Sequence, residues 1–237
     1  MQIIPAFVTQ NKCYQAGAPL TPRGIMLHSV GTPQPSAAVF ARSFNQYQPG
    51  GVSVCVHAFA QADGTVYQTL PWEMRGWHCG GSANSTHIGV EMTEPSAGMT
   101  RSEAAEQIAG TYRTVVELFA ELCKQYELDP AQDGVIIGHA EGHRRGVASN
   151  HADPELLWRT YDMGYTMDGF RRDVAEAMAK EDREEVPEMP QWARAGVQRL
   201  IDRGILSGVG NGKLDLSLDM IRTMIVCQRM LDEQKET

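Results

Sequence analysis

The sequence lacks the features that define several protein classes. No apolar run approaches the roughly 18 residues that a membrane-spanning helix needs. The first residues, MQIIPAFVTQNK, have neither the basic nor the apolar region of a signal peptide. Basic side chains are in the minority, with 21 Lys and Arg against 29 Asp and Glu and a net charge of −8. We therefore expect no membrane partner, no nucleic-acid partner, and synthesis in the cytoplasm, where the chain stays until something else releases it.

Cysteine is scarce and its pattern excludes two kinds of small protein. The five cysteines are odd in number, widely scattered and without a CxxC pair: Cys13, Cys55, Cys79, Cys123 and Cys227. Neither a disulfide framework nor a cysteine-type zinc site is indicated, so buried or idle thiols are expected. What remains is an ordinary globular composition, 237 residues with 42% hydrophobic and 21% charged, which suffices for one core and a small second unit.

Short apolar strands alternate with helical patterns over the first 180 residues. Two of the strands end on a histidine, GIMLH on His28 and GVIIGH on His139. A hairpin turns at Asp63–Gly64, and a capping box of Thr100 with Glu103 begins the clearest helix. The predicted strands are 24–28, 52–60, 65–70, 88–92 and 134–139. One predicted helix begins at Ser36, a second begins at Thr100 and is stopped by Asp129–Pro130, and the last covers 170–179. This order predicts an α/β domain with a central mixed β-sheet flanked by helices.

The sequence changes character after residue 180. Residues 181–190 are charged and proline-bearing, as in a linker. Beyond them, 191–237 predicts a small helical hairpin, with Trp192, Leu200 and Ile201 on one helix and a second helix beginning near Ser217. We expect domains 1–180 and 191–237 joined by this linker. The hairpin buries too little apolar area to be stable alone, so it should dock on the main domain or on a second copy.

The strand-end histidines are candidate metal ligands. Side chains at the carboxyl ends of strands project into loop-walled clefts. The loop SNHADPE adds His151 and Asp153, so two imidazoles and a carboxylate could occupy three corners of a tetrahedron around Zn²⁺, with water at the fourth. The alternative is that His28 and His139 simply hydrogen-bond to loops.

A competing pair is His139 with His143, which on a helix would present both rings on one face. Two details disfavour it. The glutamate stands at 141 rather than directly after the first histidine, and Gly142 is a poor helix residue.

Four segments together resemble a known family. GIMLHSVG, VHAFAQADGTVYQTLP, RGWHCGGSANSTHIGVEM and GHAEGHRRGVASNHADPELLW occur in this order over about residues 20–180. They resemble the type 2 N-acetylmuramoyl-L-alanine amidases, whose superfamily includes phage amidase lysozymes, bacterial cytosolic muropeptide amidases and peptidoglycan recognition proteins. ASNHADP is most similar to amidases of phages and prophages of Gram-positive bacteria.

The resemblance implies a role for individual residues. The zinc ligands would be His28, His139 and Asp153, the last standing just before a proline as in the family. Glu91, in the strand IGVEM, matches the acidic residue that positions or deprotonates the attacking water. His151 stands where many members carry a lysine that stabilises the oxyanion, and an imidazole N–H can serve the same purpose.

One departure from the family concerns the base. The tyrosine that some members carry in the hairpin strand is replaced by Val56, and His57 keeps the adjacent position. That tyrosine is also missing from members that use the strand glutamate, and its absence here favours Glu91 as the base. If Glu91 were only a structural carboxylate bonded to backbone or to Arg75, the base would come from His57 or His78.

The implied activity is zinc-dependent hydrolysis of the amide bond between N-acetylmuramic acid and L-alanine in bacterial peptidoglycan, as a phage or prophage endolysin. Trp77, His78 and Asn84 of the loop WHCGGSAN, together with His57, would line the groove for glycan or stem peptide. For Trp77 the alternative is a core or lid tryptophan. The alternatives for the whole chain are a non-catalytic muropeptide-binding protein and a cytosolic muropeptide-recycling amidase.

The tail carries a second, shorter resemblance. QWARAGVQRLIDRGILSG followed by GNGKLDLSLDMIRTMIVCQRML resembles one S-layer-homology-like helical repeat. The resemblance implies cell-wall targeting or self-association as a homodimer. The alternative is an appendage that covers apolar surface of the amidase domain.

Overall fold

A computed structural model describes residues 1–46, 54–184, 191–206 and 220–226 of the protein. The chain divides into two compact units, Met1–Met178 and Ala179–Thr237. Within the described ranges, no helix is both long enough and apolar enough to cross a membrane. Four cysteines are free and buried in this part of the chain, as expected, and Cys227 lies outside it.

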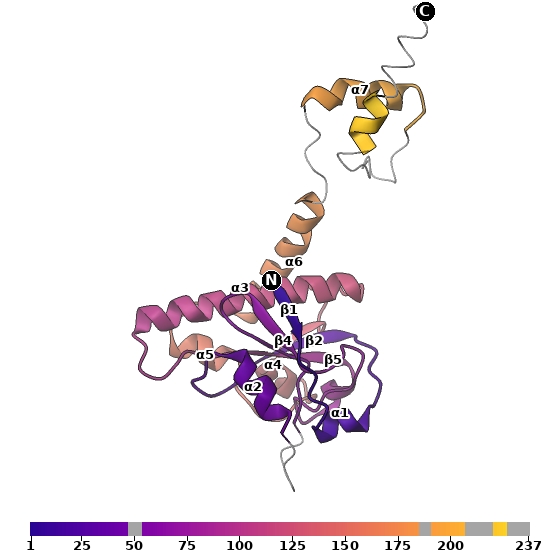
Figure 1. Ribbon diagram of the computed structural model, residues 1–237. Coiled ribbons are helices and arrows are strands. Elements are labelled where there is room, and N and C mark those ends of the chain that lie inside the picture. The colour runs from indigo at the N-terminus through magenta and orange to yellow at the C-terminus, as the bar shows by residue number, and fades with distance from the viewer. Residues whose placement is uncertain (47–53, 185–190, 207–219, 227–237) are drawn as a thin grey trace, which may run out of the picture. The chain divides into compact units, whose positions relative to one another are not determined.

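The first unit is built around a six-stranded sheet with the strand order β1-β4-β3-β5-β2-β6 (Figure 1). Its strands are β1 (Gln2–Pro5), β2 (Gly24–Ser29), β3 (Ala58–Ala60), β4 (Thr65–Gln68), β5 (His87–Met92) and β6 (Ile136–Gly138). The pair β3 and β4 is antiparallel and the other neighbours are parallel. The sheet is therefore mixed, and the predicted α/β class is confirmed.

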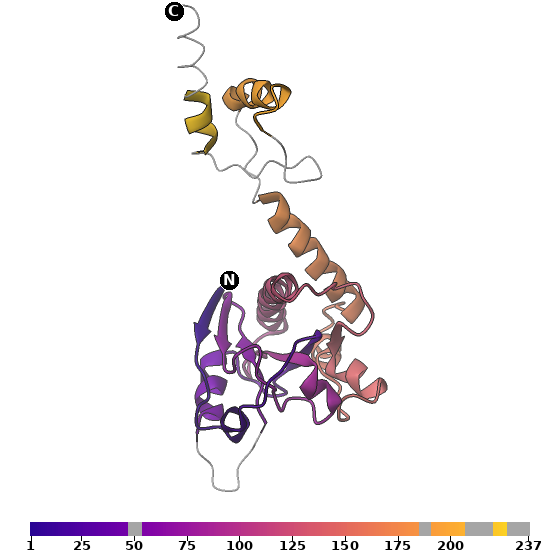
Figure 2. The ribbon, with the colours of Figure 1, turned by 90° about the vertical axis from the view of Figure 1, so that its right-hand side faces the viewer.

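Helices cover both faces of this sheet. The long helix α3 (Arg101–Gln125) packs on one face, and Figure 2 shows it nearly end-on beside the strands. The other face carries α2 (Ala37–Phe44) and α4 (His139–Arg144). The remaining helices of the unit are α1 (Lys12–Ala16), the 3₁₀ turn η1 (Ser82–Ser85), α5 (Glu155–Thr160) and α6 (Met167–Glu184).

Strand alternation decides which side chains enter the core and which enter the site. On β2 and β5, Ile25, Leu27, Ile88 and Val90 turn toward α3 and form the main core with residues such as Phe119. The intervening residues turn to the opposite face. Two of them, His28 and Glu91, thereby reach the face where α4 lies.

The predicted capping box begins α3: Thr100 Oγ1 accepts from the Glu103 backbone N–H, and the Glu103 carboxylate accepts from the Thr100 N–H. The helix ends earlier than predicted, at Gln125 rather than at Asp129–Pro130. Glu127 adopts a positive φ of 53°, and the Leu128 N–H donates to the Cys123 carbonyl. A left-handed residue closes a helix in this way without a proline.

The hairpin at Asp63–Gly64 is confirmed, with β3 and β4 as its arms. Its first arm is shorter than predicted. Cys55 makes only an isolated antiparallel bridge with Trp77, and Val52 lies outside the described residues. The short elements β1, α1, η1 and α5 had no counterpart in the sequence prediction.

Gly142 is helical against its propensity. β6 ends at Gly138 and His139 begins α4, which continues through Gly142 to Arg144. A Cβ atom at 142 would lie 2.9 Å from Met26 Cε and 3.0 Å from Ala148 Cβ, so glycine lets α4 pack closely on β2. The argument that Gly142 disfavours a helix was therefore wrong, yet His143 is exposed and contributes nothing to the site.

The second unit contains α7 (Gln191–Asp202) and a helical segment at 220–226. Ala193, Val197, Ile221 and Ile225 form its small core. The beginning of the predicted second helix, near Ser217, lies outside the described residues. Helix α6 continues to Glu184, where the sequence predicted a linker from 181, because residues 179–184 (AKEDRE) are almost all good helix formers. Residues 185–190 lie outside the described part.

Candidate active site

The carboxyl ends of three neighbouring strands carry the polar side chains of the site. β2 contributes His28, β5 contributes Glu91 at the position paired with His28, and β6 leads directly into His139. Because these strands are parallel, their carboxyl ends meet at one edge of the sheet. A cavity of about 770 Å³ opens there, lined by these three residues and by Asp153.

Three of these side chains converge on one point. The Nδ1 atoms of His28 and His139 lie 3.0 Å apart. The Asp153 carboxylate lies 3.3 Å from His28 Nδ1 and 3.5 Å from His139 Nδ1. Ligand atoms at zinc-bond length in a tetrahedron lie about 3.3 Å from one another. The two imidazoles and the carboxylate therefore fit a zinc ion, and they form a candidate metal site.

The protonation states of His28 and Asp153 favour the binding of a cation. Burial lowers the pKa of His28, although Asp153 beside it acts in the opposite direction. Burial also acts to raise the pKa of Asp153, but hydrogen bonds with His139 and His28 outweigh it and hold that pKa below its usual range. At neutral pH the group offers a neutral imidazole at His28 and an ionised carboxylate at Asp153, which are the forms that bind metals.

A chain of hydrogen bonds determines which nitrogen of His28 faces the metal site. His78 Nε2 lies 3.2 Å from the His87 carbonyl, which can only accept, so this nitrogen carries the proton. Burial, together with the nearby His28 and His57, lowers the pKa of His78 well below its usual value, so its Nδ1 is an acceptor. His28 Nε2 donates to it at 2.9 Å, which leaves His28 Nδ1 unprotonated and available as a ligand.

Gly89 makes room for this chain. A Cβ atom at 89 would lie 2.5 Å from the His78 ring, closer than any side chain tolerates. The strand β5 therefore needs glycine at this position for His78 to approach His28. The sequence predicted His78 as a groove residue; it does line the cavity, and it also holds a candidate ligand in place.

Glu91 lies beside the metal group without a structural partner. Its Oε2 is buried and accepts no hydrogen bond within the described part of the chain. Burial, and then the charges of Asp153 and Glu94, raise the pKa of Glu91 well above its usual value. A carboxylate bonded to backbone or to Arg75, the structural alternative, would not leave this oxygen unpaired. The geometry instead leaves Glu91 free to face the cavity, which it lines.

His151 lies beside His139, on the loop after α4. Its ring centroid is 4.5 Å from that of His139, and its side chain is exposed and lines the cavity. The Ser149 hydroxyl stands between the two rings, 3.2 Å from His139 Nε2 and 3.0 Å from His151 Nδ1. The structure thus brings His151 next to the three candidate ligands.

His57 is not placed where the sequence prediction put it. The side chain is fully buried, its Nε2 donates to the Met74 carbonyl at 2.7 Å, and its Nδ1 accepts from the Gly89 N–H at 2.9 Å. Burial lowers the pKa of His57 to about 4, so the ring is neutral. With both ring nitrogens bonded to backbone, His57 links the loop between β4 and β5 to β5 itself and does not line the cavity.

The loop between β4 and β5 forms one wall of the cavity. Trp77 and Asn84 both line it, as the sequence predicted for groove residues. Asn84 is itself buried, and its Oδ1 accepts from the backbone N–H groups of His78 and Cys79 at 2.9 and 3.0 Å. Asn84 therefore shapes the loop, while Trp77 offers the larger surface to a ligand.

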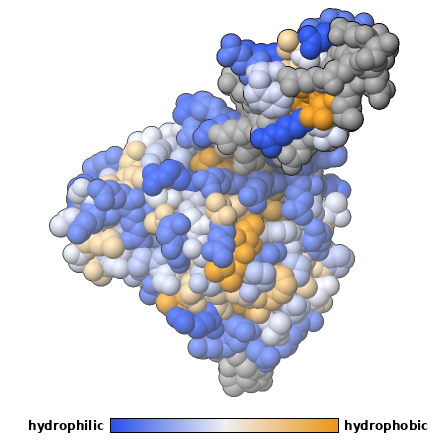
Figure 3. Space-filling model, turned by 45° about the horizontal axis from the view of Figure 1, so that its top comes forward, coloured by the Kyte–Doolittle hydropathy of each residue, from blue (hydrophilic) through white to orange (hydrophobic). Residues whose placement is uncertain are grey.

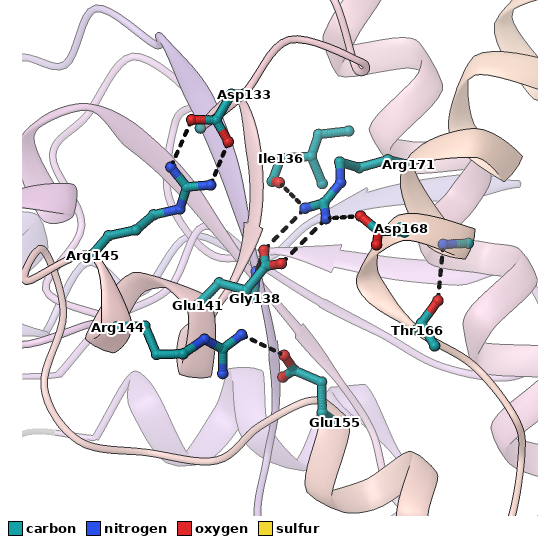
Figure 4. A network of polar contacts seen from close by, with 12 residues as sticks. Asp133, Ile136, Gly138, Glu141, Arg144, Arg145, Glu155, Thr166, Asp168 and Arg171 are labelled. Carbon is teal, nitrogen blue, oxygen red and sulfur yellow. Dashed lines mark hydrogen bonds and ion pairs between the residues drawn. The ribbon is translucent and has the colours of Figure 1, made fainter.

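A cluster of charged residues holds α4 against β6 and α6 (Figure 4). Arg171 on α6 donates to the Ile136 carbonyl at 2.9 Å and to both oxygens of Glu141 at 3.0 and 3.2 Å. Glu141 in turn accepts from the Gly138 N–H at 3.3 Å, at the beginning of α4. The Asp168 carboxylate also belongs to the cluster, because its Oδ1 accepts a hydrogen bond from Arg171 Nη2 at 2.6 Å. The helix that begins with His139 is thus tied to β6 and α6.

Sequence analysis missed three of these supporting residues. Glu141 entered the sequence argument only through its position between His139 and His143, although its spacing from Gly138 is that of a helix-capping acid and could have been recognised. Arg171 lies 30 residues further along the chain, and no local pattern connects it to the site. Ser149 carries no motif signal of its own.

Comparison with known proteins places these features in a family. A family model described as N-acetylmuramoyl-L-alanine amidase matches residues 18–156, more than half of the chain. The match includes β2 to β6, α4 and the Asp153 loop. No curated protein matches the chain.

Several solved structures share the fold. A Staphylococcus aureus hydrolase, AmiA, in complex with its ligand, is 21% identical, with a TM-score of 0.61 over 79% of this chain and 88% of that one. The catalytic domain of XlyA is 22% identical, with a TM-score of 0.55 over 73% of this chain and 99% of that one. A mutant endolysin from Bacillus subtilis is 21% identical, with the same TM-score and the same two coverages. At these identities the likeness shows the fold alone.

Proposed function

The chain belongs to the N-acetylmuramoyl-L-alanine amidase family and is a peptidoglycan amidase, and we propose that its hydrolysis depends on zinc held by His28, His139 and Asp153. The bond cleaved is the amide between the lactyl group of N-acetylmuramic acid and L-alanine. The observation that carries the proposal is the convergence of two Nδ1 atoms and a carboxylate at 3.0 to 3.5 Å. When bound, zinc lowers the pKa of its water toward about 7 and polarises the scissile carbonyl.

Glu91 is the base in this proposal. It takes a proton from the attacking water as the oxygen bonds to the carbonyl carbon, and it passes that proton to the nitrogen of L-alanine as the carbon–nitrogen bond breaks. The products are a lactyl carboxylate and a free amino group. The buried, unpaired Oε2 supports this role, because burial without a partner raises the basicity of a carboxylate.

His151 is the proposed oxyanion stabiliser. Its exposed ring lies beside His139 on the cavity wall, where it would donate to the oxygen of the scissile carbonyl. An N–H donor at this place stabilises the negative charge that develops on that oxygen. Trp77 and Asn84 would contact the glycan or the stem peptide along the adjacent wall.

We propose an endolysin of a phage or prophage as the biological role, made in the cytoplasm and acting on the wall after release. The fold shared with a Bacillus subtilis endolysin supports this role. Cleavage of intact cross-linked sacculi would favour lysis. Cleavage of soluble anhydro-muropeptides alone would favour the recycling amidase instead.

We propose that the segment 191–237 is an S-layer-homology-like unit for wall association or homodimer formation, and that residues 1–180 belong to the catalytic domain, whose last helix α6 continues to Glu184. In its described part, large apolar side chains are exposed: Trp192, Ile201, Ile205, Met220 and Val226. Figure 3 shows apolar surface on the drawn face of this smaller unit. Deleting 187–237 and measuring wall binding, oligomeric mass and thermal stability separates targeting, self-association and simple packing.

The activity itself is tested by product analysis. Purified peptidoglycan treated with the zinc-loaded chain should release stem peptides with a free L-alanine amino group while the glycan strands stay intact. Mass spectrometry identifies both products. Cleaved glycan with intact lactyl-peptide links would contradict the proposal.

A further inference from the structure

We propose that Ser149 is a positioning residue whose hydroxyl couples His139 to His151 and holds His151 with its proton on Nε2. The inference rests on the proposed function, in which His139 is a ligand and His151 a donor. It starts from one observation, the placement of Ser149 Oγ between His139 Nε2 at 3.2 Å and His151 Nδ1 at 3.0 Å.

The direction of these two hydrogen bonds follows from counting protons. His139 directs Nδ1 toward His28 and Asp153, so a ligating His139 carries its proton on Nε2. That Nε2–H donates to Ser149 Oγ. A hydroxyl has a single proton of its own, and the neighbour left to receive it is His151 Nδ1.

His151 therefore has its Nδ1 occupied as an acceptor. In a neutral imidazole whose Nδ1 accepts, the single proton is on Nε2, the nitrogen that Ser149 does not contact. This is the tautomer in which His151 can donate a hydrogen bond outward from the loop. Free histidine exchanges its proton between both nitrogens, so without Ser149 some molecules would carry the proton on Nδ1 and would not donate from Nε2.

The hydroxyl is held firmly enough to do this. The Ser149 backbone N–H donates to the Cys79 carbonyl at 2.8 Å, and the Ser149 carbonyl accepts from the His151 N–H at 3.1 Å. A Cβ atom at Gly80 would lie 3.1 Å from both Cβ and Oγ of Ser149, so the loop containing Gly80 packs directly against the side chain. The backbone contacts and the packing fix Ser149 independently of the two rings.

Ser149 thus gives His151 the same kind of support that His78 gives His28. In both cases one ring nitrogen is bound by a fixed neighbour, and the other is presented in a defined protonation form. Partners of this kind typically change activity or metal affinity about 10-fold to 100-fold when removed. Ser149 differs from His78 because its hydroxyl contacts both a candidate ligand, His139, and a candidate donor, His151.

The test compares Ser149→Ala, which removes the hydroxyl, with Ser149→Thr, which keeps one. Ser102→Ala is the matched control, because Ser102 is exposed on α3. Two quantities are measured in the full chain: the protonated nitrogen of His151 by long-range ¹H–¹⁵N NMR, and kcat and KM on a soluble muropeptide at saturating zinc. In Ser149→Ala we expect part of the His151 proton to move to Nδ1 and kcat to fall about 10-fold with KM nearly unchanged. Ser149→Thr should restore both, and Ser102→Ala should change neither.

Two results would overturn the inference. One is an unchanged His151 tautomer and an unchanged kcat in Ser149→Ala. The other is a loss of zinc affinity with kcat intact at saturating zinc, because Ser149 would then serve His139 alone. A wild-type chain that binds no zinc and releases no stem peptide overturns the proposed function instead, and the NMR comparison of the two variants still decides the role of Ser149.

Discussion

His28 and Glu91 occupy paired positions on the neighbouring parallel strands β2 and β5, so their side chains leave the same face of the sheet side by side. One is a candidate ligand with its tautomer fixed by His78, and the other is a buried carboxyl with an unpaired oxygen. The pairing places the proposed base next to the candidate metal site by means of two strands alone. Rigid elements hold such pairs more accurately than loops do.

Glu91→Gln should separate chemistry from metal binding. The amide keeps the shape of the side chain but cannot take the proton of water, so kcat should fall about 100-fold or more while one zinc per chain remains. Because the charge of a buried, unpaired carboxylate is removed, the free energy of unfolding should not decrease at neutral pH. Turnover of a muropeptide, zinc analysis and urea unfolding measure the three quantities. Full activity in a zinc-loaded variant would show that Glu91 is not the base.

Gly89→Ala should weaken zinc binding although residue 89 contacts no metal. The new methyl group would collide with the His78 ring and break its hydrogen bond to His28. We expect zinc affinity to fall about 10-fold or more, measured by chelator competition. Gly169→Ala on α6 is the control, because the nearest atom to the new methyl group would be the Thr166 hydroxyl oxygen at 3.3 Å rather than a ring at 2.5 Å. Equal zinc affinity in the two variants would contradict the proposed role of His78.

Removing Arg171 should loosen the helix that begins with His139. Arg171→Met leaves the half-buried Glu141 carboxylate without its main partner, which should cost about 2 kcal/mol of unfolding free energy. Adding Glu141→Gln to the same chain should recover part of that loss, because the unpaired charge is then gone. A double-mutant cycle measured by urea unfolding gives the coupling between the two residues. Strict additivity would mean that the contact in Figure 4 does not stabilise the protein.

The buried histidines should make the fold sensitive to acid. The pKa of His57 falls to about 4 on folding, below the unfolded value of about 6.5. A group whose pKa is lowered by folding contributes its full stability above the unfolded pKa, and that contribution is lost as pH falls through the folded pKa. Between pH 6.5 and 4, the titration of His57 should therefore lower the free energy of unfolding by up to about 3 kcal/mol.

His57→Gln tests this directly, since the amide can donate to Met74 and accept from Gly89 without titrating. Its stability should decline less between pH 6.5 and 4 than that of the wild type. The exposed His143→Gln is the control and should keep the wild-type decline. If His57→Gln also keeps it, the acid sensitivity comes from other groups.

The sequence predicted the parts of the site that lie at the ends of strands. His28 and His139 follow apolar runs that are easily recognised, and Asp153 stands before a proline in a distinctive loop. His57 was assigned to the groove by the resemblance, whereas its ring is buried with both nitrogens bonded to backbone, and a motif does not reveal which backbone groups approach a ring. Three supporting residues could not be predicted, because Ser149, Arg171 and Gly89 act through neighbours that only the folded chain brings to them.

Zinc content tests the central claim most directly. After metal loading and extensive dialysis, the wild-type chain and His143→Ala should each retain one zinc per chain by mass spectrometry, and both should clear a suspension of purified cell walls. His28→Ala and Asp153→Ala should stay folded by circular dichroism, lose the zinc and lose the clearing activity together. A folded Asp153→Ala chain that retains stoichiometric zinc, or clears walls at the wild-type rate, would contradict the account.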